Sequence, residues 1–427
     1  MMKYIRLLPT QSYESNIPKV FIYSFLTEFI LILPIWVLFL QQVRGLSLAQ
    51  VTFTDIAFWA TIVLAEVPTG AVADVFGRKI SLIIGAVVVG ISAILFGWAP
   101  TLPLILVANS LWAIGITFNS GAVQAIFYDS LLQLGREEEY TKLRGRLLVV
   151  NFSAVALSSF LGGWLGAQDL EFPFYIYSAV TFMGLPFLFR LKEPPQESDP
   201  DTKEKLTFRR TLQITADAVR RKPNLRFILL YSSLMPVSAI VVLVLFLQPF
   251  AASIGISIAA IGVIVGISQI LSAIGSAAAG RIVNLVGAWT WLRLAPFLVF
   301  IGVMSLGLFG DLTGIILFGL AAFTEPAIRP LMESLVLKHS PSSVRATILS
   351  VDALLARLFL VLIEPGLGVL ADQRGLPTTF LVLGLVSFSA IVLTLIGWSR
   401  IWKNNGKLPL EDIDEPLPSS VNPKSTG

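Results

Sequence analysis

The segment Gly70-Ala-Val-Ala-Asp74-Val-Phe-Gly77-Arg78-Lys79 connects two long apolar stretches in the first half of the chain. A degenerate copy with the same spacing, Gly280-Arg-Ile-Val-Asn284-Leu-Val-Gly287, connects two apolar stretches in the second half. Self-similarity at a fixed offset is the signature of a structural repeat. We therefore predict two homologous halves, each containing one copy of this loop.

The composition of the chain favours a membrane protein. Of its 427 residues, 55% are hydrophobic and 14% are charged, whereas soluble domains carry about 25% charged residues. A helix needs roughly 20 mainly apolar residues to cross the hydrocarbon core, and the apolar runs reach this length. We predict an all-α membrane protein with twelve transmembrane helices in two pseudo-symmetric six-helix bundles, of which the first span lies near Val20 to Gln41.

A charged, proline-rich segment that includes Glu193-Pro194-Pro195 divides the chain near its midpoint. We expect an N-terminal six-helix bundle over residues 1–190, a cytoplasmic linker over 191–224 and a C-terminal six-helix bundle over 225–400. Residues 401–427 mix proline, asparagine, serine and acids without periodicity, so we expect a disordered cytoplasmic tail there.

Basic residues gather in the loops on one side of the predicted bundles. The positive-inside rule assigns those loops to the cytoplasm, and an even number of spans then puts both termini there. We expect a multi-pass protein of the cell (inner or plasma) membrane, with membrane lipid as a partner and no nucleic acid. The basic loop residues are Arg78, Lys79, Arg136, Lys142, Arg144, Arg146, Arg281, Arg293, Lys338 and Arg345.

The residue types that most enzymes need are nearly absent from this chain. It has no cysteine and a single histidine, His339. A disulfide, a cysteine metal site and a thiol nucleophile are therefore excluded, and no Ser-His or metal-ligand cluster can form. We expect no catalytic residues, no cofactor and no metal, and we predict that the protein is not an enzyme.

The repeated loop resembles the signature loop of the major facilitator superfamily (MFS), with matches at Gly70, Asp74, Gly77, Arg78 and Lys79. The resemblance covers nearly the whole chain. It implies the MFS fold and a role for these five residues as a conformational gate loop that latches the cytoplasmic side closed.

Two shorter stretches, Glu66-Val-Pro-Thr-Gly70 and Phe127-Tyr-Asp-Ser130, are similar to prokaryotic efflux-type permeases of the superfamily. Other features depart from the drug/proton antiporters of that family. No arginine occurs between Leu104 and Tyr128, and only Gly162-Gly163 remains of the glycine-proline element of span five.

Charged residues within the predicted spans need a pairing or functional explanation, because each costs about 2.5 to 3.5 kcal/mol at mid-membrane. Glu325 and Arg357 fall at similar depth on neighbouring spans, so we hypothesise a midplane ion pair between them. The alternative is a purely structural charge network. The residues predicted to couple protons or substrate are Glu28, Glu66, Glu325, Arg329, Arg357 and Glu364.

Other polar or aromatic residues lie in spans that line the cavity in this family. As cavity-lining candidates we take Tyr23, Trp36, Asn109, Asn119, Gln124, Gln248 and Gln269.

These features lead to the prediction of a monomeric secondary active transporter that moves a small organic solute by alternating access. We expect efflux rather than uptake, with protons as the coupling ion. The alternatives are an organic-anion or metabolite uptake permease, for which Arg329 and Arg357 would supply cationic groups, and a transport-inactive membrane sensor or scaffold.

Overall fold

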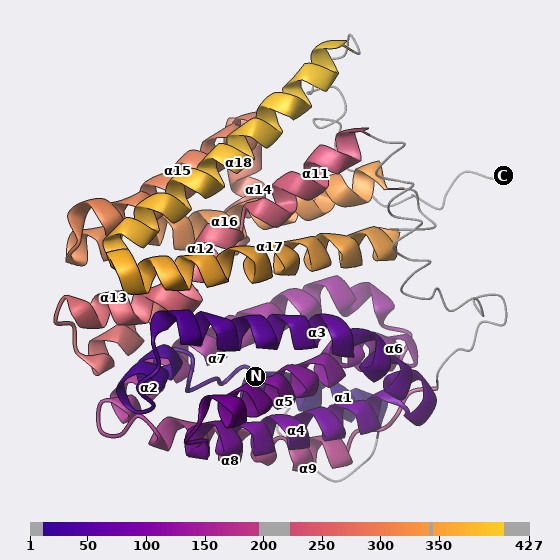
Figure 1. Ribbon diagram of the computed structural model, residues 1–427. Coiled ribbons are helices and arrows are strands. Elements are labelled where there is room, and N and C mark those ends of the chain that lie inside the picture. The colour runs from indigo at the N-terminus through magenta and orange to yellow at the C-terminus, as the bar shows by residue number, and fades with distance from the viewer. Residues whose placement is uncertain (1–11, 196–222, 341–344, 405–427) are drawn as a thin grey trace, which may run out of the picture.

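The computed structural model describes residues 12–195, 223–340 and 345–404, and all regular structure within these ranges is helical. The helices form two bundles that lie side by side (Figure 1). Residues 401–404, which were expected to belong to the tail, continue the last helix, and the rest of the tail lies outside the described residues. Most of the expected linker also lies outside them.

The N-terminal half contains helices α1 to α9 and a short 3₁₀ helix, Glu137–Glu139. The α-helices are α1 (Tyr13–Thr27), α2 (Trp36–Gln42), α3 (Leu48–Phe76), α4 (Arg78–Trp98), α5 (Leu102–Asn119), α6 (Ala122–Leu132), α7 (Tyr140–Gly166), α8 (Phe172–Met183) and α9 (Leu185–Phe189).

The C-terminal half contains helices α11 to α18 and a π-helical turn, Val242–Phe246. The α-helices are α11 (Pro223–Leu234), α12 (Val237–Val241), α13 (Leu247–Ser253), α14 (Ile258–Val286), α15 (Ala288–Phe309), α16 (Leu312–His339), α17 (Arg345–Arg374) and α18 (Leu376–Asn404).

Eleven helical segments of the described chain are long and apolar enough to cross a membrane. The twelfth span of the fold is the α1–α2 pair, which is interrupted between Glu28 and Ile35. The span predicted near Val20 to Gln41 thus consists of two helices with a break between them. Pro34 provides a reason, because proline has no N–H and disfavours helical geometry at the residue before it.

The two copies of the repeated loop have the same backbone geometry. Gly77 ends α3 and begins α4 at φ 98° and ψ 153°, and Gly287 ends α14 and begins α15 at φ 82° and ψ 146°. Glycine adopts this positive-φ conformation without steric cost. A serine N-cap, Ser47 or Ser257, also starts the long helix before each loop. The structure thus agrees with the repeat predicted from the spacing.

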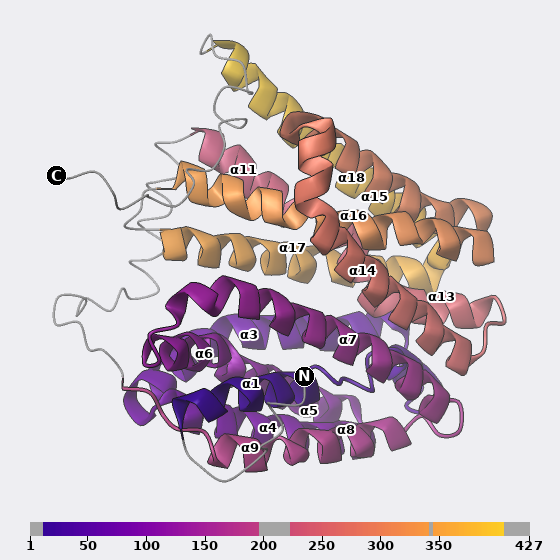
Figure 2. The same ribbon diagram turned by 180° about the vertical axis from the view of Figure 1, so that it is seen from behind.

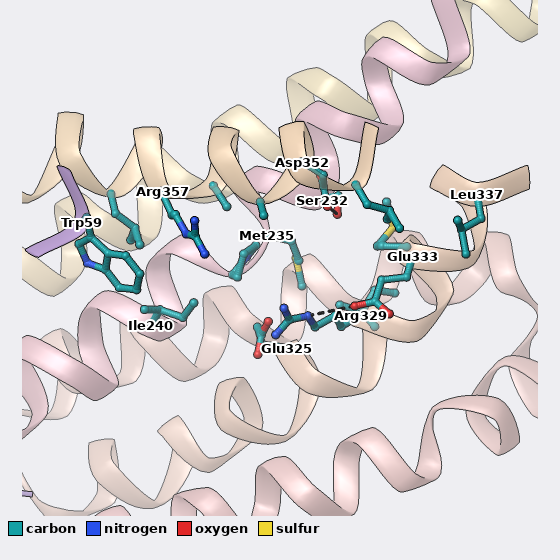
Figure 3. Close-up of a pocket in the computed structure, with 17 residues that line it drawn as sticks. Trp59, Ser232, Met235, Ile240, Glu325, Arg329, Glu333, Leu337, Asp352 and Arg357 are labelled. Carbon is teal, nitrogen blue, oxygen red and sulfur yellow. Dashed lines mark hydrogen bonds and ion pairs between the residues drawn. The ribbon is translucent and has the colours of Figure 1, made fainter. Parts of the chain in front are cut away.

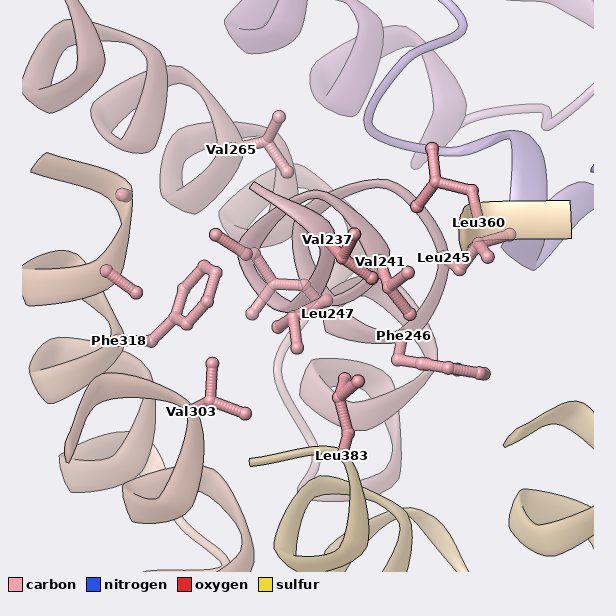
Figure 4. Packing of buried hydrophobic residues seen from close by; sticks show 14 of the residues in the cluster. Val237, Val241, Leu245, Phe246, Leu247, Val265, Val303, Phe318, Leu360 and Leu383 are labelled. Atoms are coloured by element: carbon pink, nitrogen blue, oxygen red, sulfur yellow. The ribbon is translucent and has the colours of Figure 1, made fainter. Parts of the chain in front are cut away.

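Buried apolar side chains join the two halves. One cluster includes Ile35 and Val51 from the N-terminal half together with Phe246 and Leu360 from the C-terminal half. Figure 4 shows its packing around α12 and the π-helical turn. A smaller cluster around Phe127 lies within the N-terminal half alone.

Candidate functional site

The most extensive helix contacts between the halves are those of α3 with α17 (Figure 1) and of α7 with α14 (Figure 2). We call the end where residues 195 and 223 lie the linker end, and the opposite end, which carries the loop Val43–Ser47, the far end. Contacts between the halves are closest toward the far end. A Cβ added to Gly163 of α7 would lie 2.5 Å from Gly262 Cα of α14. Such small residues let helix backbones approach closely.

Hydrogen bonds between the start of α3 and a side chain of α17 also join the two halves at the far end. The two carboxylate oxygens of Asp372 accept hydrogen bonds from Leu48 N and Ala49 N, each at 2.9 Å. A carboxylate at a helix N-terminus satisfies free N–H groups and is stabilised by the helix dipole. This contact holds α17 against the N-terminal half.

The interruption of the first span is bridged by Gln248 of α13, whose side chain is fully buried. Its Nε2 donates to Leu33 O at 2.8 Å, and its Oε1 accepts from Val37 N at 3.1 Å. Backbone groups at membrane depth must find partners within the protein. One side chain from the C-terminal half thus satisfies backbone groups on both sides of a break in the N-terminal half.

Two buried carboxyl groups meet across the α3–α17 contact. Asp55 is 7% exposed and Glu364 is 1% exposed, and their side chains hydrogen-bond each other. Oε2 of Glu364 is buried and has no N–H or hydroxyl donor among the described residues. Two ionised carboxylates cannot share a hydrogen bond, because neither has a donor. A proton on either carboxyl group would supply that donor, and we refer to Asp55 and Glu364 as the carboxyl pair.

Asp55 was not among the residues predicted from the sequence. Asp55 lies only a few residues after the Ser47 N-cap. Its position in the sequence is therefore typical of an acidic residue near the start of a helix and does not by itself indicate a charge within a span. The rule that every intramembrane charge needs an explanation would have found it.

Closer to the linker end, α3 and α17 are joined by an ion pair. Arg357 Nη1 lies 2.8 Å from Glu66 Oε2, and both side chains are partly exposed. This corrects the hypothesis of an Arg357–Glu325 pair: equal depth on neighbouring spans does not determine which helix faces a side chain meet. Arg357 points across the contact between the halves.

A cavity of about 570 Å³ lies beside this ion pair, between α3, α11, α12, α16 and α17 (Figure 3). Among the described residues, Trp59 alone lines it from the N-terminal half, and the Trp59 Nε1 donates to Asp55 Oδ2 at 2.9 Å. Its charged lining residues are Glu325, Arg329, Glu333, Asp352 and Arg357, and its apolar lining includes Met235, Ile240, Ile328, Met332, Leu349 and Leu360.

The charged side chains that line the cavity differ in their hydrogen-bond and ion-pair partners. Arg329 Nε lies 3.4 Å from Glu333 Oε1. Asp352 accepts hydrogen bonds from the hydroxyls of Ser232 at 2.9 Å and Ser233 at 3.3 Å. Glu325 faces the cavity with no hydrogen-bond or ion-pair partner among the residues that the structure describes.

Two residues of the predicted gate loop, Arg78 and Lys79, are bound within their own half. Arg78 pairs with Asp129, and the backbone N–H groups of Arg78 and Lys79 donate to the Glu193 carboxylate at 2.8 and 2.9 Å. The Lys79 ammonium donates to Phe189 O at 2.8 Å. Glu193, which sequence reasoning treated only as part of the linker, thus caps α4.

Gly70 and Asp74 lie in the last turns of α3. A Cβ added to Gly70 would meet no atom within 4 Å. Close helix packing at Gly70 is therefore not seen in this conformation.

The polar residues predicted to line the cavity lie elsewhere in the described structure. Tyr23 donates to Asn119 at 2.5 Å, and Asn109 donates to Thr54 O at 2.7 Å, both as packing contacts between helices. Trp36 is buried at the start of α2. Gln124 and Gln269 are partly buried, on α6 and α14, and Glu28 ends α1.

Comparison with known proteins identifies one family. The profile of the Major Facilitator Superfamily matches residues 20–362. No curated protein matches the chain. The relation thus rests on the family profile and on solved structures.

Several solved transporters have a similar fold. The nucleoside transporter NupG is 14% identical, with a TM-score of 0.72, covering 90% of this chain and 99% of that one. A bacterial homolog of the human lysosomal transporter Spinster, in an inward-facing and unoccupied conformation, is 15% identical with a TM-score of 0.68, covering 96% and 100%. A D-xylose-proton symporter is 16% identical with a TM-score of 0.68, covering 92% and 98%. At these identities the likeness concerns the fold alone.

Proposed function

The chain belongs to the Major Facilitator Superfamily, and from this premise we propose that it is a proton-driven secondary transporter that exports a small organic solute by alternating access. Membership of the family supports transport of a small molecule across a membrane. The cavity between the halves is the proposed solute site. We propose export, proton coupling and the cycle of conformations that links them.

We assign the linker end to the cytoplasm, because the loops there carry the basic residues such as Arg78 and Lys79. Both termini then lie in the cytoplasm of a cell (inner or plasma) membrane. With this orientation the far end faces outward, and its close contacts make the structure an inward-facing conformation.

The carboxyl pair is the observation that carries the proposal. It joins the two halves near the far end, where they must separate for the solute to leave on the other side. When the pair shares a proton, Asp55 and Glu364 attract each other. When the proton is lost, two buried negative charges repel each other in a medium of low dielectric constant. A single proton thus decides whether this contact favours closure or opening.

Other ionisable groups along the α3–α17 contact do not neutralise the pair. Glu66 and Arg357 bind each other, and Arg357 is seven residues from Glu364, about 10 Å along the helix. Asp372 caps α3 at the far end. Among the described residues, Trp59 supplies the N–H donor to the pair, and its ring lines the cavity.

These contacts suggest an antiport cycle. Solute that enters the inward-facing cavity packs against the Trp59 ring and strengthens the hydrogen bond from Trp59 Nε1 to Asp55, which favours the ionised form of the pair. The pair then releases its proton toward the cytoplasm, and repulsion opens the far end so that the solute leaves. A proton from the outside neutralises the pair again and closes the far end. One proton moves inward for each solute that moves outward.

Flux into and out of liposomes tests this function. Purified protein is reconstituted and offered a panel of a cationic dye, a nucleoside and an organic acid, with and without a pH gradient. We expect gradient-driven movement of at least one compound, and its loss in Asp55→Asn and Glu364→Gln, in which two negative charges can no longer face each other. Absence of flux for every compound under every pH or ion gradient would support the sensor or scaffold alternative instead.

A further inference from the structure

The charges that line the cavity do not balance. Three carboxylates, Glu325, Glu333 and Asp352, face two guanidinium groups, Arg329 and Arg357. A buried charge needs a compensating partner, because its loss of hydration is otherwise not offset. The lining as a whole therefore has excess negative charge.

Both arginines already have partners. Arg357 is held by Glu66, which lies on the other half of the protein, at 2.8 Å. Arg329 forms its ion pair with Glu333 at 3.4 Å. Each positive charge is thus at least partly balanced by a carboxylate before any solute binds. This weakens the organic-anion alternative that the two arginines suggested.

Two carboxylates remain without a cationic partner. Glu325 has no hydrogen-bond or ion-pair partner within the described part of the chain, although Arg329 is near enough to act on it electrostatically. Among the described residues, Asp352 accepts hydrogen bonds from the hydroxyls of Ser232 and Ser233, and Arg329 also acts on it electrostatically. Figure 3 shows Glu325 on α16 and Asp352 on α17, both facing the cavity.

The remaining surface of the cavity is apolar and polarisable. Met235 lies near its middle, and Trp59 and Ile240 lie together at one end (Figure 3). Met332 also lines it. Methionine side chains adapt to ligands of irregular shape, and the face of a tryptophan ring attracts cations. This surface suits the hydrophobic body of an amphipathic molecule.

We infer that the cavity binds an organic cation, with its positively charged group against Glu325 and Asp352 and its apolar body between Trp59 and the two methionines. The inference rests on the proposed transport function in taking this cavity as the solute site. To the proposed transport function the inference adds the sign of the charge on the solute and the side chains that bind the charged group.

Equilibrium dialysis of the full chain in lipid nanodiscs, with no gradient, tests the inference. The probe is radiolabelled tetraphenylphosphonium, whose charge is independent of pH, and empty nanodiscs correct for partition into lipid. Tetraphenylborate, an anion of the same shape, and neutral triphenylphosphine oxide are measured in the same way. We expect tetraphenylphosphonium to bind more tightly than either.

Removing a carboxylate and removing a guanidinium group from the cavity should change the affinity for the cation in opposite directions. Glu325→Gln should weaken binding of the cation about tenfold or more, as expected when a charge-assisted contact is lost. Arg329→Gln should strengthen it, because Glu333 is then uncompensated. Glu138→Gln, the same change at an exposed position in the 3₁₀ helix, should leave binding unchanged.

Three results would overturn the inference: no binding of tetraphenylphosphonium, tighter binding of tetraphenylborate, or equal binding of the cation by the wild-type protein and Glu325→Gln. The outcome is independent of flux. Cation binding without flux in liposomes would contradict the transport function alone, and proton-driven flux of an anion without cation binding would contradict this inference alone.

Discussion

Trp59 connects the cavity to the carboxyl pair: its ring lines the cavity, while its Nε1 donates a hydrogen bond to Asp55 at 2.9 Å. Asp55 in turn contacts Glu364 on the other half of the protein. A ligand that moves the indole ring therefore changes the hydrogen bonding of a group that joins the two halves. The solute site and the proposed proton site are linked through one side chain.

Replacing Trp59 with phenylalanine tests this connection. Trp59→Phe keeps an aromatic ring in the cavity but removes the N–H donor to Asp55. We expect solute binding in nanodiscs to change little, while the solute gradient formed per unit pH gradient in liposomes falls severalfold. Trp36→Phe, at a buried tryptophan away from the cavity, is the control. Equal coupling in Trp59→Phe and the wild-type protein would show that the indole does not transmit the signal.

Gln248 is expected to stabilise the broken first span. Gln248→Leu fills a similar volume but leaves Leu33 O and Val37 N without their partner. Each unsatisfied buried polar group costs about 1 to 3 kcal/mol, so the Tm in detergent should fall clearly. Gln269→Leu, at a partly buried glutamine of α14, should have little effect. An unchanged Tm in Gln248→Leu would mean that these backbone groups find other partners.

The close approach of α7 and α14 makes a steric prediction. A Cβ at Gly163 would lie 2.5 Å from Gly262 Cα, whereas one at Gly145 of the same helix would meet nothing within 4 Å. Gly163→Val should prevent closure of the far end, and Gly145→Val should not. Because the chain contains no cysteine, a single cysteine at the far end, Thr52→Cys, reports closure through its rate of thiol labelling. Equal labelling rates in the two valine variants would contradict the prediction.

The Glu66–Arg357 ion pair should contribute to holding the inward-facing state. Each partner is partly exposed, so its contribution to stability is expected to stay near or below about 1 kcal/mol. A double-mutant cycle with Glu66→Gln and Arg357→Gln, measured from thermal unfolding, gives the coupling free energy. Because Arg357→Gln also leaves Glu66 unpaired beside the cavity, that variant should bind tetraphenylphosphonium more tightly. Weaker binding would show that Arg357 contacts the solute.

Much of the fold was predictable from the sequence, because hydrophobic length and a repeated loop depend only on local chemistry. The similar backbone angles of Gly77 and Gly287 agree with the spacing that their two loops share. The interruption before Trp36 was not predicted, although Pro34 was a signal for it. Its partner Gln248 lies in the other half of the chain, and no local pattern connects the two.

The candidate site was less predictable than the fold. Glu66, Arg357 and Glu364 were identified because charges in spans need an explanation, but their partners depend on how α3 and α17 rotate against each other. Asp55 was missed although the same rule applies to it. Contacts between the halves also depend on which end of the protein is closed, and a sequence does not specify one state of a cycle.

The most direct test of the central claim is the pH dependence of the distance between the halves at the far end. Nitroxide labels at Gln168→Cys and Gln373→Cys, exposed positions on opposite halves, report this distance by double electron-electron resonance in nanodiscs. We predict short distances at low pH, where the carboxyl pair shares a proton, and a growing population of longer distances as pH rises. In Glu364→Gln the short distances should persist at every pH. The same pH-dependent lengthening in Glu364→Gln, or none in the wild-type protein, would contradict the claim that a proton on this pair controls the far end.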